Sequence, residues 1–271
     1  GIEVTYYLAD GSDLKQKIQS NTKVIYVECP GSLVYEMLDL REVASFAKQH
    51  QCLTIADNTW GSGWLYRPLE LGADVSIIAA TKYLSGHSDV MMGVTVTNQA
   101  AWPKLQKAVI DFGQTVGADD AYLVSRGIRS LPARLALHEK NARQIAEWLQ
   151  QREEIKQVFC PALPTDPNHA HWLRDCHGTN GLLTIEFARI HTQKNIEQMI
   201  DALRLFGLGA SWGGFESLVI PANMQNARSL TDWSQRGQVV RLHIGLEDPE
   251  DLITFMVHLS HYTRTVKIIL S

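Results

Sequence analysis

Short apolar runs alternate with amphipathic stretches through the first half of the chain. We expect strands at residues 2–8, 24–28, 52–56, 75–78 and 94–96, and helices at residues 13–19 and 40–49. Asp39 is a favourable N-cap for the second of these helices, which carries Val43, Phe46 and Ala47 at helical spacing. Because apolar strands joined by helices are typical of β-α-β units, this half predicts an α/β fold with a mostly parallel, buried sheet.

The character of the sequence changes near residue 128. Beyond it we expect helices at 132–151 and 195–205, strands at 182–187, 217–220 and 239–244, and a last helix with Asp248 as N-cap and Pro249 at its first position. Residues 221–237 are expected to form an ordered, irregular surface segment. We therefore predict two domains, a large α/β domain over residues 1–128 and a smaller α+β domain over residues 129–271.

Charge and cysteine content argue against several classes of protein. The chain has 25 Lys and Arg against 29 Asp and Glu, a net charge of −4, so we expect no nucleic-acid partner. No apolar run approaches the roughly 20 residues of a membrane-spanning helix, and no membrane partner is expected. The four cysteines are widely spaced and form no C-x-x-C pair, which favours a reduced, cytoplasmic setting.

The sharpest chemical cluster follows two neighbouring strands. Asp57 stands at the end of one predicted strand, and Thr81 and Lys82 follow the next. Ligands of parallel α/β sheets bind beyond the carboxyl ends of the strands, so Asp57 and Lys82 would face one crevice. Such a lysine can form a Schiff base with a carbonyl cofactor, while an aspartate can keep a pyridine nitrogen protonated, as in pyridoxal phosphate sites. In the alternative interpretation Asp57 only ends its strand and Lys82 is solvated.

A longer set of motifs carries a resemblance to a known family. These motifs are Asp57-Asn-Thr-Trp, Ala80-Thr-Lys-Tyr-Leu-Ser-Gly-His-Ser-Asp89, Ser125-Arg-Gly127 with Arg134 and His138, Ser211-Trp-Gly-Gly-Phe-Glu-Ser217, and Arg241-Leu-His-Ile-Gly-Leu-Glu-Asp248. In this order they resemble the cystathionine γ-synthase type, or Cys/Met metabolism, family of fold-type I enzymes that depend on pyridoxal phosphate. The resemblance implies a three-layer large domain with a mostly parallel sheet and a smaller α+β domain behind it. It also implies that the first third of the family's chain, with further cofactor-binding residues, is missing.

The resemblance assigns roles around the cofactor. It implies that Lys82 bonds to pyridoxal phosphate, that Asp57 pairs with the pyridine nitrogen, and that Thr81 contacts the phosphate. Many relatives have a serine where this chain has Ala79, so Ala79 belongs to the expected cofactor site but supplies no hydroxyl.

The resemblance also places the substrate. It implies that Arg241 binds the substrate α-carboxylate, with Ser211 and Trp212 lining the same pocket. It further implies a small amino-acid thioether as substrate and a homo-oligomer, a tetramer built as a dimer of dimers, in the full-length protein.

Two short segments favour one branch of the family. Ser211-Trp-Gly-Gly and Pro30-Gly-Ser32 resemble the branch that cleaves the Cβ–S bond, whereas relatives acting at Cγ commonly read Ser-Leu-Gly-Gly. The expected reaction is β-elimination of L-cystathionine to homocysteine, pyruvate and ammonia. A γ-synthase or γ-lyase type of reaction and a catalytically silent fragment remain as alternatives. The sequence does not decide among cystathionine, cystine and related substrates.

Other chemistry-bearing residues receive simpler interpretations. His169, His171, Cys176 and His177 match no standard zinc spacing, and we expect no metal. His243 shares a strand face with Arg241, and we interpret it as a packed, hydrogen-bonded histidine rather than an acid or base.

Overall fold

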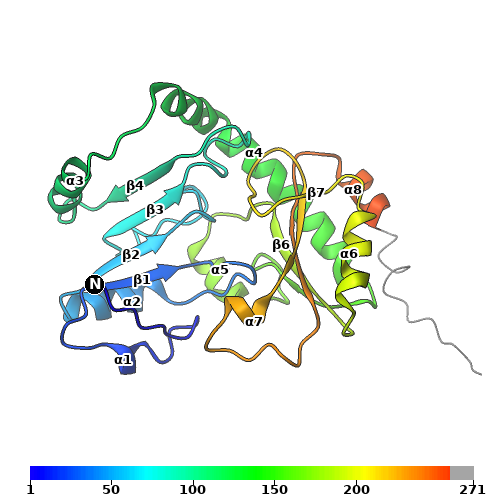
Figure 1. Ribbon diagram of the computed structural model, residues 1–271, viewed down its shortest axis with the longest axis horizontal. Coiled ribbons are helices and arrows are strands. Elements are labelled where there is room, and N and C mark those ends of the chain that lie inside the picture. Colours follow the sequence, from blue (N-terminus) through cyan, green and yellow to red (C-terminus); the bar gives the residue numbers. More distant parts are fainter. Residues whose placement is uncertain (257–271) are drawn as a thin grey trace, which may run out of the picture.

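The computed structural model describes residues 1–256, and its two sheets lie on either side of a central helix (Figure 1). The first sheet has four strands in the order β1 (Val24–Glu28), β2 (Leu53–Asp57), β3 (Val75–Ala79) and β4 (Gly93–Thr97). β1, β2 and β3 are parallel, and β4 is antiparallel to β3. All four strands lie within one residue of their predicted bounds, and the mostly parallel α/β sheet is confirmed.

The helices of this half are short. They are α1 (Leu14–Lys17), α2 (Leu40–Gln49) and α3 (Trp102–Asp111), of which α3 was not predicted. The Asp39 side chain accepts hydrogen bonds from the backbone N–H groups of Arg41 and Glu42, so the predicted N-cap of α2 is confirmed. α2 buries Leu40, Val43, Ala44 and Ala47 and packs against β2.

The second sheet has five strands. Their order is β5 (Ile155–Phe159), β6 (Leu182–Phe187), β9 (Val239–His243), β8 (Leu218–Ala222) and β7 (Gly207–Leu208). Every residue of β6 and β9 is buried. The helices around this sheet are α5 (His169–Asp175), α6 (Gln193–Asp201), α7 (Met224–Ala227) and α8 (Pro249–Met256). Asp248 accepts a hydrogen bond from the Glu250 N–H at the start of α8, which fits its prediction as N-cap.

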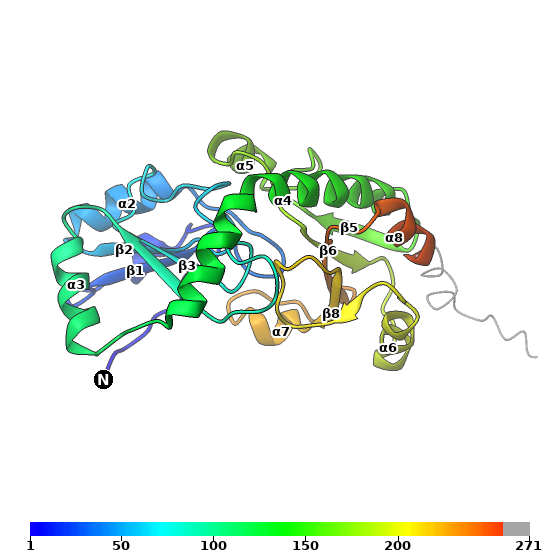
Figure 2. The same ribbon diagram turned by 90° about the horizontal axis from the view of Figure 1, so that it is seen from above.

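The long helix α4 (Ala118–Gln150) connects the halves and corrects the prediction of a helix beginning at Pro132. Pro132 lies inside this helix, where its ring removes one backbone hydrogen bond, and Figure 2 shows that α4 is bent. The true start has Gly117 before it and Asp119 and Asp120 in its first turn, which suits the positive end of a helix. α4 runs across residue 128, so the two-domain division remains a prediction. The last part of the predicted second domain, residues 257–271, lies outside the described residues.

The strand predicted at residues 2–8 is wrong. Ile2, Val4 and Tyr6 alternate as a strand would, but they are 95%, 67% and 68% exposed and no described strand pairs with them. Alternation of side chains makes a strand only where a second backbone supplies hydrogen bonds. The segment predicted as irregular, residues 221–237, instead contains the end of β8 and the short helix α7.

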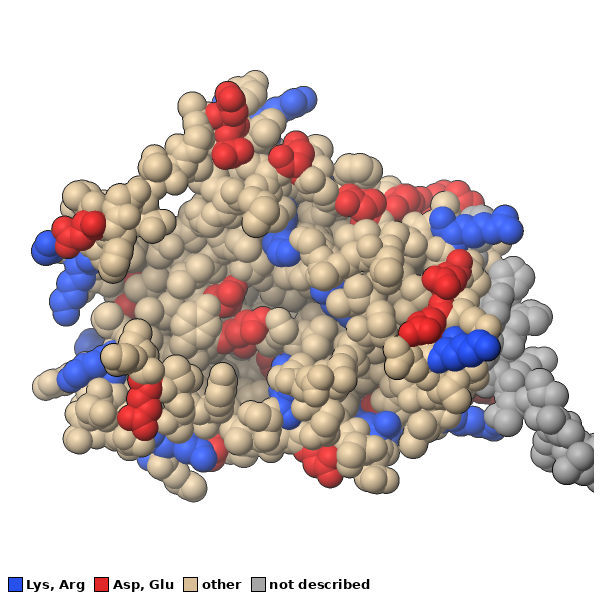
Figure 3. All heavy atoms as spheres, in the orientation of Figure 1, with Lys and Arg blue, Asp and Glu red and all other residues tan. Residues whose placement is uncertain are grey.

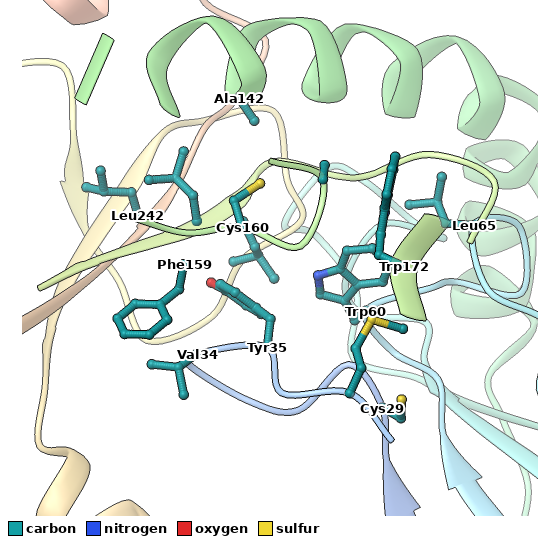
Figure 4. Packing of buried hydrophobic residues seen from close by; sticks show 14 of the residues in the cluster. Cys29, Val34, Tyr35, Trp60, Leu65, Ala142, Phe159, Cys160, Trp172 and Leu242 are labelled. Carbon is teal, nitrogen blue, oxygen red and sulfur yellow. The ribbon is translucent and has the colours of Figure 1, made fainter. Parts of the chain in front are cut away.

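A buried contact joins the halves beside the first sheet. Tyr35, from the loop after β1, lies among Trp60 of the first half and Phe159 and Cys160 of the second (Figure 4). Its hydroxyl is 3.1 Å from Oγ1 of Thr184 in β6. This contact fixes the loop after β1 against the second sheet. The loop lies beside the carboxyl ends of the strands of the first sheet.

Candidate active site

A cavity of about 270 Å³ lies between the carboxyl ends of β1, β2 and β3 and the second sheet. Figure 3 shows this face hollowed near its middle, with acidic and basic side chains around the hollow. The cavity is lined by Glu28, Pro30, Gly31, Ser32, Leu33, Tyr35, Asp57, Thr59, Trp60, Ala79, Lys82, Leu182, Trp212 and Arg241. The crevice expected from the order of the strands therefore exists, and it contains Asp57 and Lys82 together.

Lys82 is half-buried at the end of the segment that follows β3. Its Nζ donates a hydrogen bond of 2.5 Å to Oγ of Ser211 and lies 5.3 Å from the centroid of the Trp212 ring. Burial and the nearby charge of Arg241 lower the pKa of Lys82. A lysine held in this way has a larger fraction of neutral, reactive amine at neutral pH than a solvated lysine has.

Asp57 is the last residue of β2 and points its carboxylate at the cavity. Oδ1 accepts a 2.9 Å hydrogen bond from the Thr59 N–H, and Oδ2 is 3.5 Å from the Tyr26 hydroxyl. Burial, followed by the charges of Asp57 and Glu28, raises the pKa of Tyr26 to about 12, so its hydroxyl stays a donor. The carboxylate is thus oriented by two donors and remains available to a cation in the cavity.

Thr81 and Ala79 flank Lys82 but differ in what they offer. The Thr81 hydroxyl exchanges hydrogen bonds with the backbone of Met92, at 3.0 Å to its N–H and 3.4 Å to its carbonyl. Ala79 lines the cavity, but its N–H is bound to Oγ1 of Thr59 at 3.0 Å. Thr81 is not among the cavity-lining residues, so its predicted phosphate contact remains a prediction.

Arg241 enters the cavity from β9 and is only 5% exposed. Its Nη1 donates to the carbonyl of Ala210 at 3.0 Å, and Nη2 to those of Gly209 and Ser211 at 2.9 and 3.1 Å. Its Nε has no partner, and among residues 1–256 no carboxylate forms an ion pair with it. A buried cation without an anionic partner beside a cavity is suited to bind an anionic ligand.

The sequence analysis missed the cavity-lining Glu28 and, behind the cavity wall, Arg228. Glu28, the last residue of β1, is in register with Asp57, so the same strand-end rule could have identified it. Burial is the main cause that raises the pKa of Glu28, and Ser32 Oγ donates to its carboxylate at 2.5 Å. Arg228, from the segment predicted as a surface excursion, binds the Ser32 carbonyl and both oxygens of Glu36. This segment therefore holds the loop that forms one wall of the cavity.

The histidines behave as packed groups. His243 is fully buried, and both of its ring nitrogens are hydrogen-bonded to backbone, which confirms its interpretation as a packed histidine. His169 binds the Pro161 carbonyl through Nδ1 at 2.9 Å. In the described part of the chain, no three His, Cys, Asp or Glu residues gather as metal ligands would. Likewise, none of the described helices is both long and apolar enough to cross a membrane.

The groups around the cavity define a class of site. A half-buried primary amine, an oriented carboxylate and a buried guanidinium surround one space, and these are the groups that an enzyme using pyridoxal phosphate needs. A family model described as Cys/Met metabolism PLP-dependent enzyme matches residues 1–257. The chain belongs to this family, whose cofactor is pyridoxal phosphate, and the resemblance seen in the sequence is confirmed.

Similar proteins differ in the activity that their names record. A cystathionine beta-lyase from Bordetella avium is 47% identical over 255 residues, covering 93% of this chain and 64% of that protein. An L-alanine/L-glutamate racemase from Wolbachia pipientis wMel is 38% identical over 255 residues, covering 94% of this chain and 63% of that protein. The chain therefore spans slightly less than two thirds of these relatives.

A solved structure supports the fold. Cystathionine gamma synthase from Xanthomonas oryzae pv. oryzae, in complex with cystathionine, superimposes with a TM-score of 0.80 at 33% identity. The superposition covers 89% of this chain and 63% of that one. The predicted fold-type I architecture is confirmed.

Proposed function

We propose that the protein is a carbon–sulfur lyase that cleaves the Cβ–S bond of L-cystathionine and releases homocysteine, pyruvate and ammonia. The observation that carries the proposal is the placement of Lys82, Asp57 and Arg241 around one cavity with Trp212 as a wall. The name of the relative from Bordetella avium supports the substrate and the reaction. Pyridoxal phosphate, when bound, supplies an aldehyde that bonds to amines and a ring that takes up negative charge from the substrate.

The cofactor would be held by residues of the first half. Lys82 supplies the amine for the aldehyde, and Asp57, already oriented by Thr59, supplies the negative charge that keeps the ring nitrogen protonated. Thr81 is proposed to approach the phosphate from the segment beside Lys82. Ala79 contributes only its surface, because its N–H is bound to Thr59.

The substrate would be held by residues of the second half. Arg241 binds the α-carboxylate, and Ser211 and Trp212 bound the space next to it. Lys82, whose lowered pKa favours the neutral amine, would remove the Cα proton. Arg241 orients the substrate and carries no proton.

The test uses the protein in the length that its gene encodes, supplied with pyridoxal phosphate and L-cystathionine. We expect equal amounts of pyruvate and homocysteine, and borohydride reduction followed by peptide mapping should label Lys82 and leave Lys104 unlabelled. Release of cysteine and a four-carbon oxo acid would mean γ-elimination. In a separate incubation with L-alanine, formation of D-alanine by a protein that releases no pyruvate from cystathionine would indicate a racemase instead. A label on another lysine would exclude the proposed role of Lys82.

A reaction at Cγ is the second candidate, favoured by the structural similarity to a cystathionine gamma synthase. Trp212 distinguishes the two, because its bulky ring stands 5.3 Å from the Lys82 amine and limits the space beyond Cβ. Trp212→Leu is expected to raise the ratio of γ- to β-elimination products. An unchanged ratio would remove Trp212 as the specificity residue.

We further propose that the full-length protein is a cytoplasmic tetramer. The four cysteines are free, as in a reducing compartment, and exposed apolar side chains gather on α3 and the start of α4, among them Trp102, Ile110, Phe112 and Tyr122. Light scattering of the full-length protein measures the assembly directly. A monomeric mass would contradict the proposal.

A further inference from the structure

One face of β9 holds the loop that covers Lys82. Arg241 and His243 are two residues apart on this strand and therefore lie on the same face. Arg241 binds the carbonyls of residues 209–211, as described above. His243 binds the rest of the loop: its Nε2 accepts from the Gly213 N–H at 3.1 Å, and its Nδ1 is 3.0 Å from the Glu216 carbonyl. We call residues 209–216 the covering loop.

Gly213 is the point where the covering loop touches the lysine segment. Its φ of +88° is a conformation that glycine adopts readily. A Cβ placed there would lie 2.8 Å from the Tyr83 nitrogen and 3.0 Å from the Lys82 Cα. The backbone of the covering loop therefore packs directly against the backbone of the lysine segment. The two preceding residues consequently place the Ser211 hydroxyl and the Trp212 ring at the Lys82 amine.

His243 must be neutral to make both bonds. Its Nδ1 faces a carbonyl and carries the hydrogen, which leaves Nε2 as the acceptor that the Gly213 N–H requires. Its surroundings are the rings of His138 and Tyr83, with centroids 5.2 and 5.7 Å away, and the charges of Arg241 and Lys82. Burial and these neighbours hold the pKa of His243 well below its usual range, so the imidazole stays uncharged.

We propose that His243 is a positioning residue: by accepting the Gly213 N–H at Nε2, it holds the covering loop so that Ser211 and Trp212 set the position of the Lys82 amine. The role of Lys82 itself rests on the proposed function. His243 touches neither cofactor nor substrate and acts only through the loop.

Two substitutions separate its two hydrogen bonds. In His243→Asn the amide nitrogen can replace Nδ1 as donor to Glu216, but no acceptor reaches Gly213. In His243→Gln the longer side chain brings its amide oxygen to the place of Nε2. The full-length protein carries each variant, and thermal unfolding confirms that each one is folded.

The first readout needs neither cofactor nor reaction. Competitive acetylation of the cofactor-free protein over a range of pH measures the apparent pKa of Lys82 against the exposed Lys104. We expect His243→Asn to raise the pKa of Lys82, because the amine is no longer held and buried, and His243→Gln to restore the lowered value. In a Ser211→Ala background the effect of His243→Asn should largely disappear, because both changes break the same connection.

The second readout is turnover. A loop displaced by a fraction of an ångström should lower kcat/KM for cystathionine roughly 10–100-fold in His243→Asn, and His243→Gln should stay within about threefold of the parent. Equal Lys82 pKa values in folded His243→Asn and in the parent would overturn the proposal. Equal shifts of the Lys82 pKa in the Asn and Gln variants would also overturn the proposal. If the Asn variant does not fold, a folded Gln variant with the Lys82 pKa of a free lysine overturns it, and a parent-like value supports it.

The two readouts distinguish a failure of the proposed function from a failure of the positioning role of His243. Absence of lyase activity in the parent with the expected acetylation pattern would contradict the proposed function and leave the positioning role of His243 standing. Lyase activity with no effect of either substitution on the Lys82 pKa would support the proposed function and contradict the positioning role of His243.

Discussion

The two sheets contribute to the cavity in different ways. In β1 buried and exposed side chains alternate, whereas every side chain of β6 and β9 is buried. The first sheet delivers Asp57 and Lys82 at or beyond the ends of its strands. The second sheet delivers Arg241 from inside a strand, between Thr184 and Ile220 on its neighbours. A group at a strand end has water and loops around it, but a group inside a fully buried strand such as β9 is surrounded by protein.

Polar groups inside the second sheet are accordingly tied to named partners. Glu186 is fully buried and binds Lys156 and Arg236, and Thr184 meets the Tyr35 hydroxyl. Such groups are costly to disturb, because a buried polar atom that loses its partner is not rescued by water. The comparison therefore predicts that substitutions in the first sheet act mainly on chemistry, whereas those in the second act on binding and stability.

The largest expected effect separates chemistry from binding. Asp57→Asn keeps the side-chain shape but removes the negative charge, so kcat for β-elimination should fall roughly a thousandfold with an unchanged melting temperature. Arg241→Lys keeps the charge but loses the bidentate fork, so the loss should be roughly 10–100-fold and appear mainly in KM. Steady-state kinetics on cystathionine measures both. Equal losses in kcat and KM for the two variants would contradict the division between the sheets.

The next effect concerns stability. Leu183, at the centre of β6, is 0% exposed, and Leu183→Ala should lower the free energy of unfolding by about 3–4 kcal/mol. The matched change in the first sheet is Val24→Ala, at a residue 42% exposed, which should cost no more than about 0.5 kcal/mol. Urea unfolding measures both. A difference below about 1 kcal/mol would contradict the expectation that the burial of Leu183 sets the cost.

A smaller effect depends on pH. Burial lowers the pKa of His138 from 6.5 to about 4, so between these values the unfolded state binds a proton that the folded state does not. The free energy of unfolding should therefore fall as the pH falls from 6.5 to 4, and His138 should account for about 3 kcal/mol at most. His138→Asn, which can still donate to the Ile244 carbonyl, should flatten this dependence.

The control for the pH prediction lies in the first half. His50 is exposed after α2, and His50→Asn makes the same substitution at a residue that is not buried. Urea unfolding of both variants at pH 7 and pH 4.5 makes the measurement. A slope that responds to His50 and not to His138 would contradict the burial argument.

The smallest effect lies where the halves meet. Asp39 caps α2 and also pairs with Arg174 at 2.6 Å, in a partly exposed ion pair. Asp39→Ala should cost about 1 kcal/mol, because the cap is lost, whereas Asp39→Asn keeps the cap and should cost only a few tenths. Thermal unfolding distinguishes them. An Asn variant as unstable as the Ala variant would mean that the ion pair with Arg174, not the cap, accounts for the lost stability.

Local sequence predicted the elements whose signals are local. The strands of the first sheet, the cap of α2 and the strand β6 follow from apolar runs and capping residues within about ten positions. The strand-end rule alone also predicted that Asp57 and Lys82 face one crevice, which the cavity confirms. The same reasoning failed at residues 2–8, where alternation was present but no described strand was available to pair with it, and at Pro132, which α4 accommodates inside a helix.

The sequence alone therefore determined the class of fold, the family and the chemical groups of the site, because strand order and motif residues are encoded locally. Only the tertiary structure decided how those groups are held. Ser211 meets Lys82 across 129 positions of sequence, and Gly213 meets His243 across 30. Such contacts depend on how the two halves pack against each other, and packing is set by the sum of many weak interactions rather than by any one pattern of residues. For that reason the motifs could identify the lysine and the strand β9 could be predicted, while the hydrogen bonds from β9 to the loop over the lysine became visible only in the folded chain.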